Sequence, residues 1–95
     1  MAKLHIYTPL DSVVICGEFC EWNLERSLRV YRAVWEKGRG KKAKFITVNF
    51  MPKGEYRVLS CKNFACGEVY PTDGRQMPNR YFSGEANEVI CVYFK

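Results

Sequence analysis

The residues with the most reactive side chains in this 95-residue chain are one histidine, five cysteines and ten scattered carboxylates. His5 stands alone near the N-terminus, and a lone histidine is more often a surface residue than a general base. Glu18 and Glu21 lie close to Trp22, and two carboxylates can hydrolyse a glycosidic bond. A domain of this size offers little depth in which to bury one of them as a general acid. Without a Gly-rich phosphate loop or a nucleophile elbow, the sequence predicts neither an enzyme nor a bound cofactor.

The cysteines are the second candidate for chemistry: Cys16, Cys20, Cys61, Cys66 and Cys91. None of their spacings is C-x-x-C, and a zinc site would need four converging ligands in a chain that has a single histidine. The first residues lack the apolar run of a signal peptide. We therefore predict a cytoplasmic, reduced protein whose cysteines pack as small hydrophobes and hold no metal. No segment approaches the ~20 apolar residues that cross a bilayer, so a membrane is not an expected partner.

Aromatic and basic residues point to binding rather than catalysis. Aromatic residues make up 15% of the chain, more than a small core holds, so some should lie on the surface, where Trp and Tyr suit contacts. The net charge is +5, and much of it falls in residues 37–44, K-G-R-G-K-K-A-K. This segment could touch a polyanion. However, no aromatic interleaves with its charges as a single-strand stacking platform requires, so a solvated hairpin tip is favoured and nucleic acid is not an expected partner.

The elements that must position any site are strands. Apolar and polar residues alternate over 46–50, and 13–16 is a short apolar run typical of a central strand buried on both faces. Residues 4–7 predict an edge strand cut by Pro9, and 88–94 a last strand of high β propensity. Arg57 should face away from its neighbours Tyr56 and Val58. About seven short antiparallel strands predict an all-β, immunoglobulin-like sandwich forming a single domain over 1–95, with an up-and-down barrel as the alternative.

Three segments carry a family resemblance: V-V-I-C-G-E-F-C-E-W-N at 13–23, F-I-T-V-N-F-M-P-K-G-E-Y-R-V at 45–58 and M-P-N-R-Y at 77–81. In this order they resemble the starch-binding modules of carbohydrate-binding module families 20 and 48, which include the glycogen-binding domain of the AMP-activated kinase β subunit. The likeness extends over nearly the whole chain, and G-x-F-x-x-W is its most specific motif. It implies an immunoglobulin-like sandwich that binds α-glucan without catalysis.

The resemblance also implies site residues. Trp22 matches the family's first sugar-stacking Trp, Arg57 replaces its usual Lys on the strand after the turn, and Asn79 matches the Asn of P-N-R. The second stacking Trp has no match; Tyr70 is the first substitute and Phe64 the second. An aromatic ring can cover the apolar face of a sugar, while Arg and Asn side chains can hydrogen-bond the hydroxyls.

Two other interpretations remain open from the sequence. Trp22 could cap the core, while Arg57 and Asn79 could be ordinary surface residues. The chain would then be a protein-interaction or structural domain that has lost the sugar site, because one fold serves many functions. A polyanion could instead bind residues 37–44, and that binding would weaken steeply with salt, whereas sugar binding would not.

Overall fold

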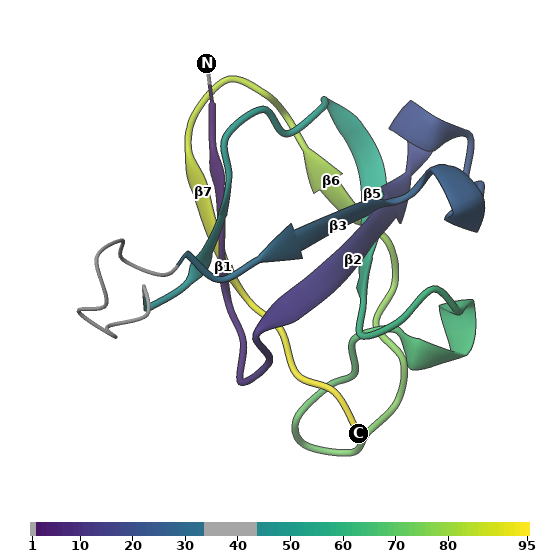
Figure 1. Cartoon of the computed structure of the whole chain (residues 1–95). Coiled ribbons are helices and arrows are strands. Elements are labelled where there is room, and N and C mark those ends of the chain that lie inside the picture. The colour runs from purple at the N-terminus through teal and green to yellow at the C-terminus, as the bar shows by residue number, and fades with distance from the viewer. Residues whose placement is uncertain (1, 34–43) are drawn as a thin grey trace.

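The computed structural model describes residues 2–33 and 44–95, which form two β-sheets (Figure 1). The order β4-β1-β7 makes the three-stranded sheet, from β1 (Leu4–Tyr7), β4 (Ile46–Val48) and β7 (Glu88–Cys91). The order β3-β2-β5-β6 makes the four-stranded sheet, from β2 (Ser12–Gly17), β3 (Leu28–Tyr31), β5 (Gly54–Leu59) and β6 (Arg80–Phe82). Three short 3₁₀ turns follow β2 and β5: η1 (Glu18–Cys20), η2 (Leu24–Arg26) and η3 (Phe64–Cys66).

The main core lies between the two sheets. The three-stranded sheet contributes Leu4, Ile6, Ile46, Val48, Ile90 and Val92, and the four-stranded sheet contributes Val13, Ile15, Tyr56, Val58 and Phe82. The buried residues alternate with exposed or half-buried ones along β1 and β4, because successive side chains of a strand point to opposite faces. The predicted all-β fold with two packed sheets is confirmed for the described residues.

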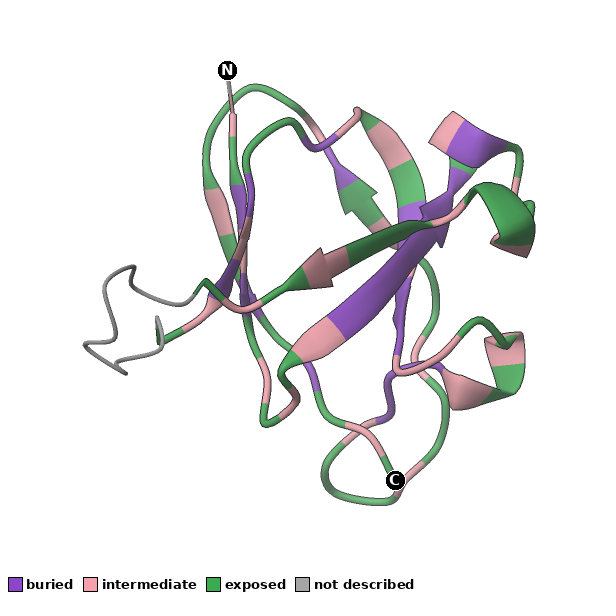
Figure 2. Cartoon of the chain, viewed as in Figure 1, coloured by how far each residue is buried: buried purple, intermediate pink, exposed green. Residues whose placement is uncertain are grey.

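Strand β2 is the most deeply buried element, as Figure 2 shows along its length. It lies between β3 and β5. Val13 and Ile15 face the main core, whereas Val14 and Cys16 face a second cluster with Cys20 and Leu59 on the outside of the sheet. The prediction of a central strand buried on both faces is confirmed. The outer face of β2 is covered by the 3₁₀ turns that follow β2 and β5.

Two features differ from the sequence-based prediction. Residues 4–7 form a central strand rather than an edge strand, because Pro9 lies beyond the paired residues and removes no ladder donor. The sheets are also not antiparallel throughout, since β1 pairs with β7 in parallel. The basic segment 37–44 lies outside the described residues except for Lys44. Within the described part of the chain, no helix has the length and apolarity needed to cross a membrane.

Candidate functional site

Trp22 lies in a tight turn immediately after η1. Glu21 and Trp22 have φ of 55° and 58°, in a left-handed region that few non-glycine residues occupy. The Trp22 N–H donates to the Gly17 carbonyl at 3.0 Å, which closes the turn. Gly17 fits because a Cβ there would lie 2.4 Å from the Glu55 carbonyl oxygen of β5. The G-x-F-x-x-W motif is therefore a compact turn that presents a half-buried Trp22 above the outer face of the four-stranded sheet.

The ring that accompanies Trp22 is Phe64. The two ring centroids lie 6.4 Å apart with an interplanar angle of 48°. Both rings pack at the border of the second cluster, above Cys20 and Leu59. Phe64 comes from η3, whose start is fixed by Asn63, since its Oδ1 accepts from the Ala65 N–H at 2.8 Å. Two connections separated by more than forty residues thus bring two tilted aromatic rings together.

Arg57 lies beside η3 on the outer side of β5. Tyr56 and Val58 are buried in the main core, so Arg57 occupies the opposite face, as predicted from alternation. Its Nη2 donates to Gln76 Oε1 at 2.6 Å, and Gln76 Nε2 donates to the Ala65 carbonyl at 3.3 Å. Gly67 leaves room for this arrangement, because a Cβ there would lie 2.4 Å from Arg57 Nη2. The guanidinium is thereby held next to the turn that carries Phe64.

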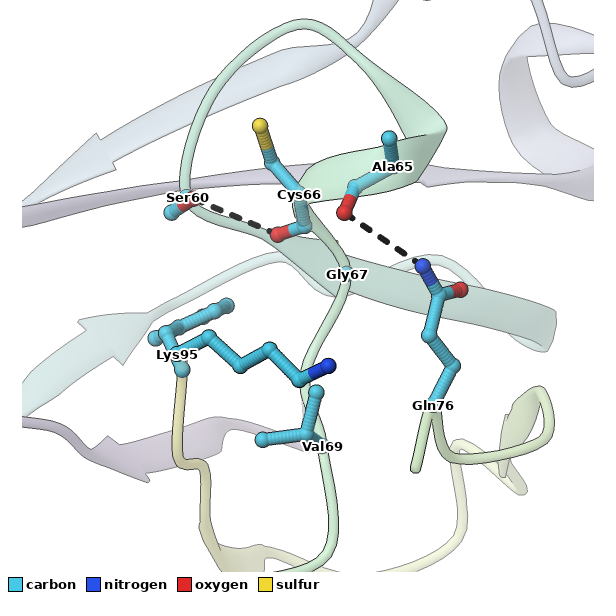
Figure 3. Close-up of a pocket in the computed structure, with 8 residues that line it drawn as sticks. Ser60, Ala65, Cys66, Gly67, Val69, Gln76 and Lys95 are labelled. Atoms are coloured by element: carbon cyan, nitrogen blue, oxygen red, sulfur yellow. Dashed lines mark hydrogen bonds between the residues drawn. The ribbon is translucent and has the colours of Figure 1, made fainter. Parts of the chain in front are cut away.

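A small hollow adjoins this hydrogen-bonded group (Figure 3). Its volume is about 200 Å³, and its lining includes Ala65, Cys66, Gln76 and Lys95. Figure 3 shows the Gln76 amide pointing to the Ala65 carbonyl across its rim. In η3, Phe64 therefore packs against Trp22, and the next two residues, Ala65 and Cys66, line a hollow of mixed polar and apolar character.

Tyr70 and Asn79 occupy a different part of the β5–β6 connection. Tyr70 is half-buried, and the Arg75 guanidinium carbon lies 5.4 Å from its ring centroid. Tyr70 is not among the described residues packed around Trp22. Asn79 is exposed and directly precedes Arg80. The side chain named second for the missing Trp, Phe64, is therefore the one that contacts Trp22.

An ion pair fixes the strand that follows Asn79. Arg80 Nε donates to Glu68 Oε1 at 2.6 Å and Arg80 Nη2 to Glu68 Oε2 at 2.9 Å. Glu68 is 2% exposed, and its hydrogen bond raises the pKa of the Arg80 guanidinium. The pair links the β5–β6 connection, which contains Glu68, to Arg80 at the start of β6, directly after Asn79.

The cysteines differ from the expectation of five reduced thiols. Cys61 and Cys66 form a disulfide that encloses Phe64, because η3 brings their Cα atoms to 5.9 Å. Cys16 and Cys20 are buried thiols whose sulfurs lie 3.6 Å apart under the Trp22 turn. Burial, followed by the hydrogen bond with Cys20, raises the pKa of the Cys16 thiol to about 11. Among the described residues, no group of three or more His, Cys, Asp or Glu side chains is placed to hold a metal.

Two of the residues considered for catalysis, Glu18 and His5, have structural partners. Glu18 is exposed, and its Oε2 accepts from the Glu55 N–H at 2.5 Å, which ties η1 to β5. His5 Nδ1 lies 3.0 Å from Thr47 Oγ1 on the neighbouring strand. These contacts give each side chain a role in joining elements.

Comparison with protein-family models, with curated proteins and with solved structures finds no match to this chain. The geometry adds one residue that sequence reasoning missed, Gln76. Its link to Arg57 and Ala65 joins two parts of the chain that no local motif connects.

Proposed function

We propose that the chain binds α-glucan without catalysis, on a surface formed by Trp22 and Phe64, with an immunoglobulin-like sandwich as its scaffold. The observation that carries the proposal is the pair of tilted rings, 6.4 Å apart, at the border of the second cluster. Rings at an angle suit a curved α-glucan better than a flat chain, because each can cover the C–H face of a different sugar.

Backbone conformation supports this assignment of Trp22. Glu21 and Trp22 are successive non-glycine residues with positive φ, a conformation that costs free energy. Packing a Trp in the core does not by itself require this conformation, and such backbone outliers cluster at functional sites. Arg57 and Gln76 lie on the side of η3 next to the hollow, where their hydrogen-bonding groups can reach sugar hydroxyls. Under this proposal, Tyr70 and Asn79, which lie further along the β5–β6 connection, contact the glucan outside the Trp22–Phe64 pair.

The test is affinity electrophoresis through gels with and without glycogen. Wild type should be retarded by glycogen, and Trp22→Ala and Phe64→Ala should each lose most of that retardation. Tyr31→Ala is the matched control, because Tyr31 is a 66% exposed aromatic on β3 of the same sheet. Circular dichroism of each variant separates lost binding from lost structure, and Trp22→Tyr, which keeps a ring, should retain part of the retardation. Wild type that migrates equally in both gels rejects the proposal.

A further inference from the structure

The outward face of the three-stranded sheet forms a second surface, distinct from the Trp22 side (Figure 1). The strand register places its side chains in rows across the sheet. Thr47, His5 and Val89 are paired in one row. Tyr7 and Cys91 are paired in the next row. Phe45 extends this row, because the Phe45 ring contacts the Tyr7 ring. The intervening residues of the same strands are buried in the main core, so these rows point away from it.

Aromatic rings gather at one end of this surface. The Phe45 ring lies 4.8 Å from His5 and 5.0 Å from Tyr7, both edge-on. Tyr7 is 40% exposed and Tyr93 46% exposed. Together with Pro9 and Lys44, these two tyrosines line a shallow hollow of about 270 Å³. Flat rings are thus open to solvent at the end of the sheet where Lys44 lies.

The charge on this surface has one sign. The outward positions of the three strands and their flanks carry no Asp or Glu: they are Lys3, His5, Tyr7, Phe45, Thr47, Asn49, Asn87, Val89, Cys91 and Tyr93. Lys44 precedes Phe45 and is exposed beside Tyr7 and Tyr93 at the hollow. Glu88 pairs with Leu4, which places it in the inward-facing set, and its Oε2 accepts from the Ser83 N–H at 3.5 Å. Lys3 and Lys44 are exposed at opposite ends of the surface. The chain as a whole carries +5.

We infer that this surface binds single-stranded nucleic acid, with Tyr7 and Tyr93 stacking on bases and Lys3 and Lys44 contacting phosphates. Exposed aromatics on a sheet can stack two or three bases, and such stacking tolerates any base sequence. Nucleic acid supplies both flat apolar rings and negative charge, which match the two properties of this surface. An apolar partner surface, or the same surface of a second copy, would match its aromatic part but would leave the two lysines without a counter-charge.

The experiment is fluorescence anisotropy of the full chain with a fluorescein-labelled dT12 oligonucleotide and an abasic oligonucleotide of equal length. The abasic strand keeps the phosphates and removes the bases. Wild type should bind dT12 at least about fivefold more tightly, because stacking on one base contributes that much or more. Lys44→Gln should lower the slope of log affinity against log salt by about 0.7, the value for one phosphate contact on a single strand.

Variants assign the binding to the tyrosines. Tyr7→Ala and Tyr93→Ala should each weaken dT12 binding by at least about fivefold, whereas Tyr7→Phe, which keeps the ring, should stay within about twofold of wild type. Tyr81→Ala is the matched control, because Tyr81 is 55% exposed on β6 of the other sheet.

Several results overturn the inference. Equal affinity for dT12 and the abasic strand, or dT12 binding that does not change in Tyr7→Ala and Tyr93→Ala, assigns the interaction to charge alone. Absence of dT12 binding also rejects it. A dimer in analytical ultracentrifugation that Tyr7→Ala dissociates assigns the surface to a second copy. Binding to phosphatidylserine vesicles in preference to dT12 assigns it to an anionic membrane.

Discussion

The two outer faces of the sandwich differ in what covers them. On the four-stranded sheet, the turns after β2 and β5 cover Val14, Cys16 and Leu59, and the Trp22–Phe64 pair lies at the border of that cover. On the three-stranded sheet, Tyr7, Val89 and Tyr93 are 40%, 60% and 46% exposed. The proposed glucan site on the covered face is built from turns, whereas the proposed nucleic-acid surface on the open face is built from side chains of the strands and of the residues beside them. Substitutions on the covered face should therefore affect folding and glucan binding together, whereas substitutions on the open face should affect binding with little effect on folding.

The largest expected effect is on the covered face. Leu59→Ala should lower the free energy of unfolding by about 3 kcal/mol, because it leaves a cavity under the turns at a fully buried position. Urea denaturation measures the change. A loss below about 1 kcal/mol would mean that the turns collapse into the space, and that the cover is less rigid than the packing indicates.

A pH dependence should come next, from Cys16 on the same covered face. Its pKa of about 11 lies above the ordinary 9.0, so its stabilising contribution is complete below pH 9 and is lost as the pH rises towards 11. The shift corresponds to a loss on the order of 2 to 3 kcal/mol. Comparing urea denaturation of wild type and Cys16→Val at both pH values, without oxygen, isolates this contribution. Equal pH dependence of the two proteins would contradict it.

Opening the Cys61–Cys66 disulfide should have a slightly smaller effect. The loop that it closes is short, so the expected loss of stability is roughly 2 kcal/mol. Phe64 lies within the loop, and the emission of Trp22 should therefore change when the bond is absent. The measurement compares Cys61→Ser/Cys66→Ser with the disulfide-containing protein, each in a Trp35→Phe background that leaves Trp22 as the one tryptophan. Unchanged emission would show that the disulfide does not position Phe64.

The smallest effect is expected on the open face. Val89→Thr should change the free energy of unfolding by less than about 0.5 kcal/mol, because Val89 is 60% exposed and Thr keeps a β-branched side chain. The same urea experiment applies. A loss comparable to that of Leu59→Ala would mean that the open face is covered in solution, for example by another copy of the chain.

Sequence reasoning predicted the features that depend on neighbouring residues. The apolar run at 13–16 gave a strand buried on both faces, and alternation placed Arg57 opposite Tyr56 and Val58. The position of 4–7 within its sheet was predicted incorrectly, because a strand's neighbours depend on pairing with residues far along the chain. From the family resemblance, Tyr70 was ranked before Phe64 as the second aromatic of the candidate site. The tertiary packing instead places Phe64 against Trp22.

The sequence by itself determined the strand faces, the compact turn at Gly17 and the presence of surplus aromatics, since side-chain alternation and the absence of a Cβ act locally. The tertiary structure decided which of these aromatics meet. Trp22 and Phe64 come from two turns, and Tyr7, Phe45 and Tyr93 from or beside three strands. The physical reason is that strand order and loop closure bring together residues whose separation along the chain carries no local signal.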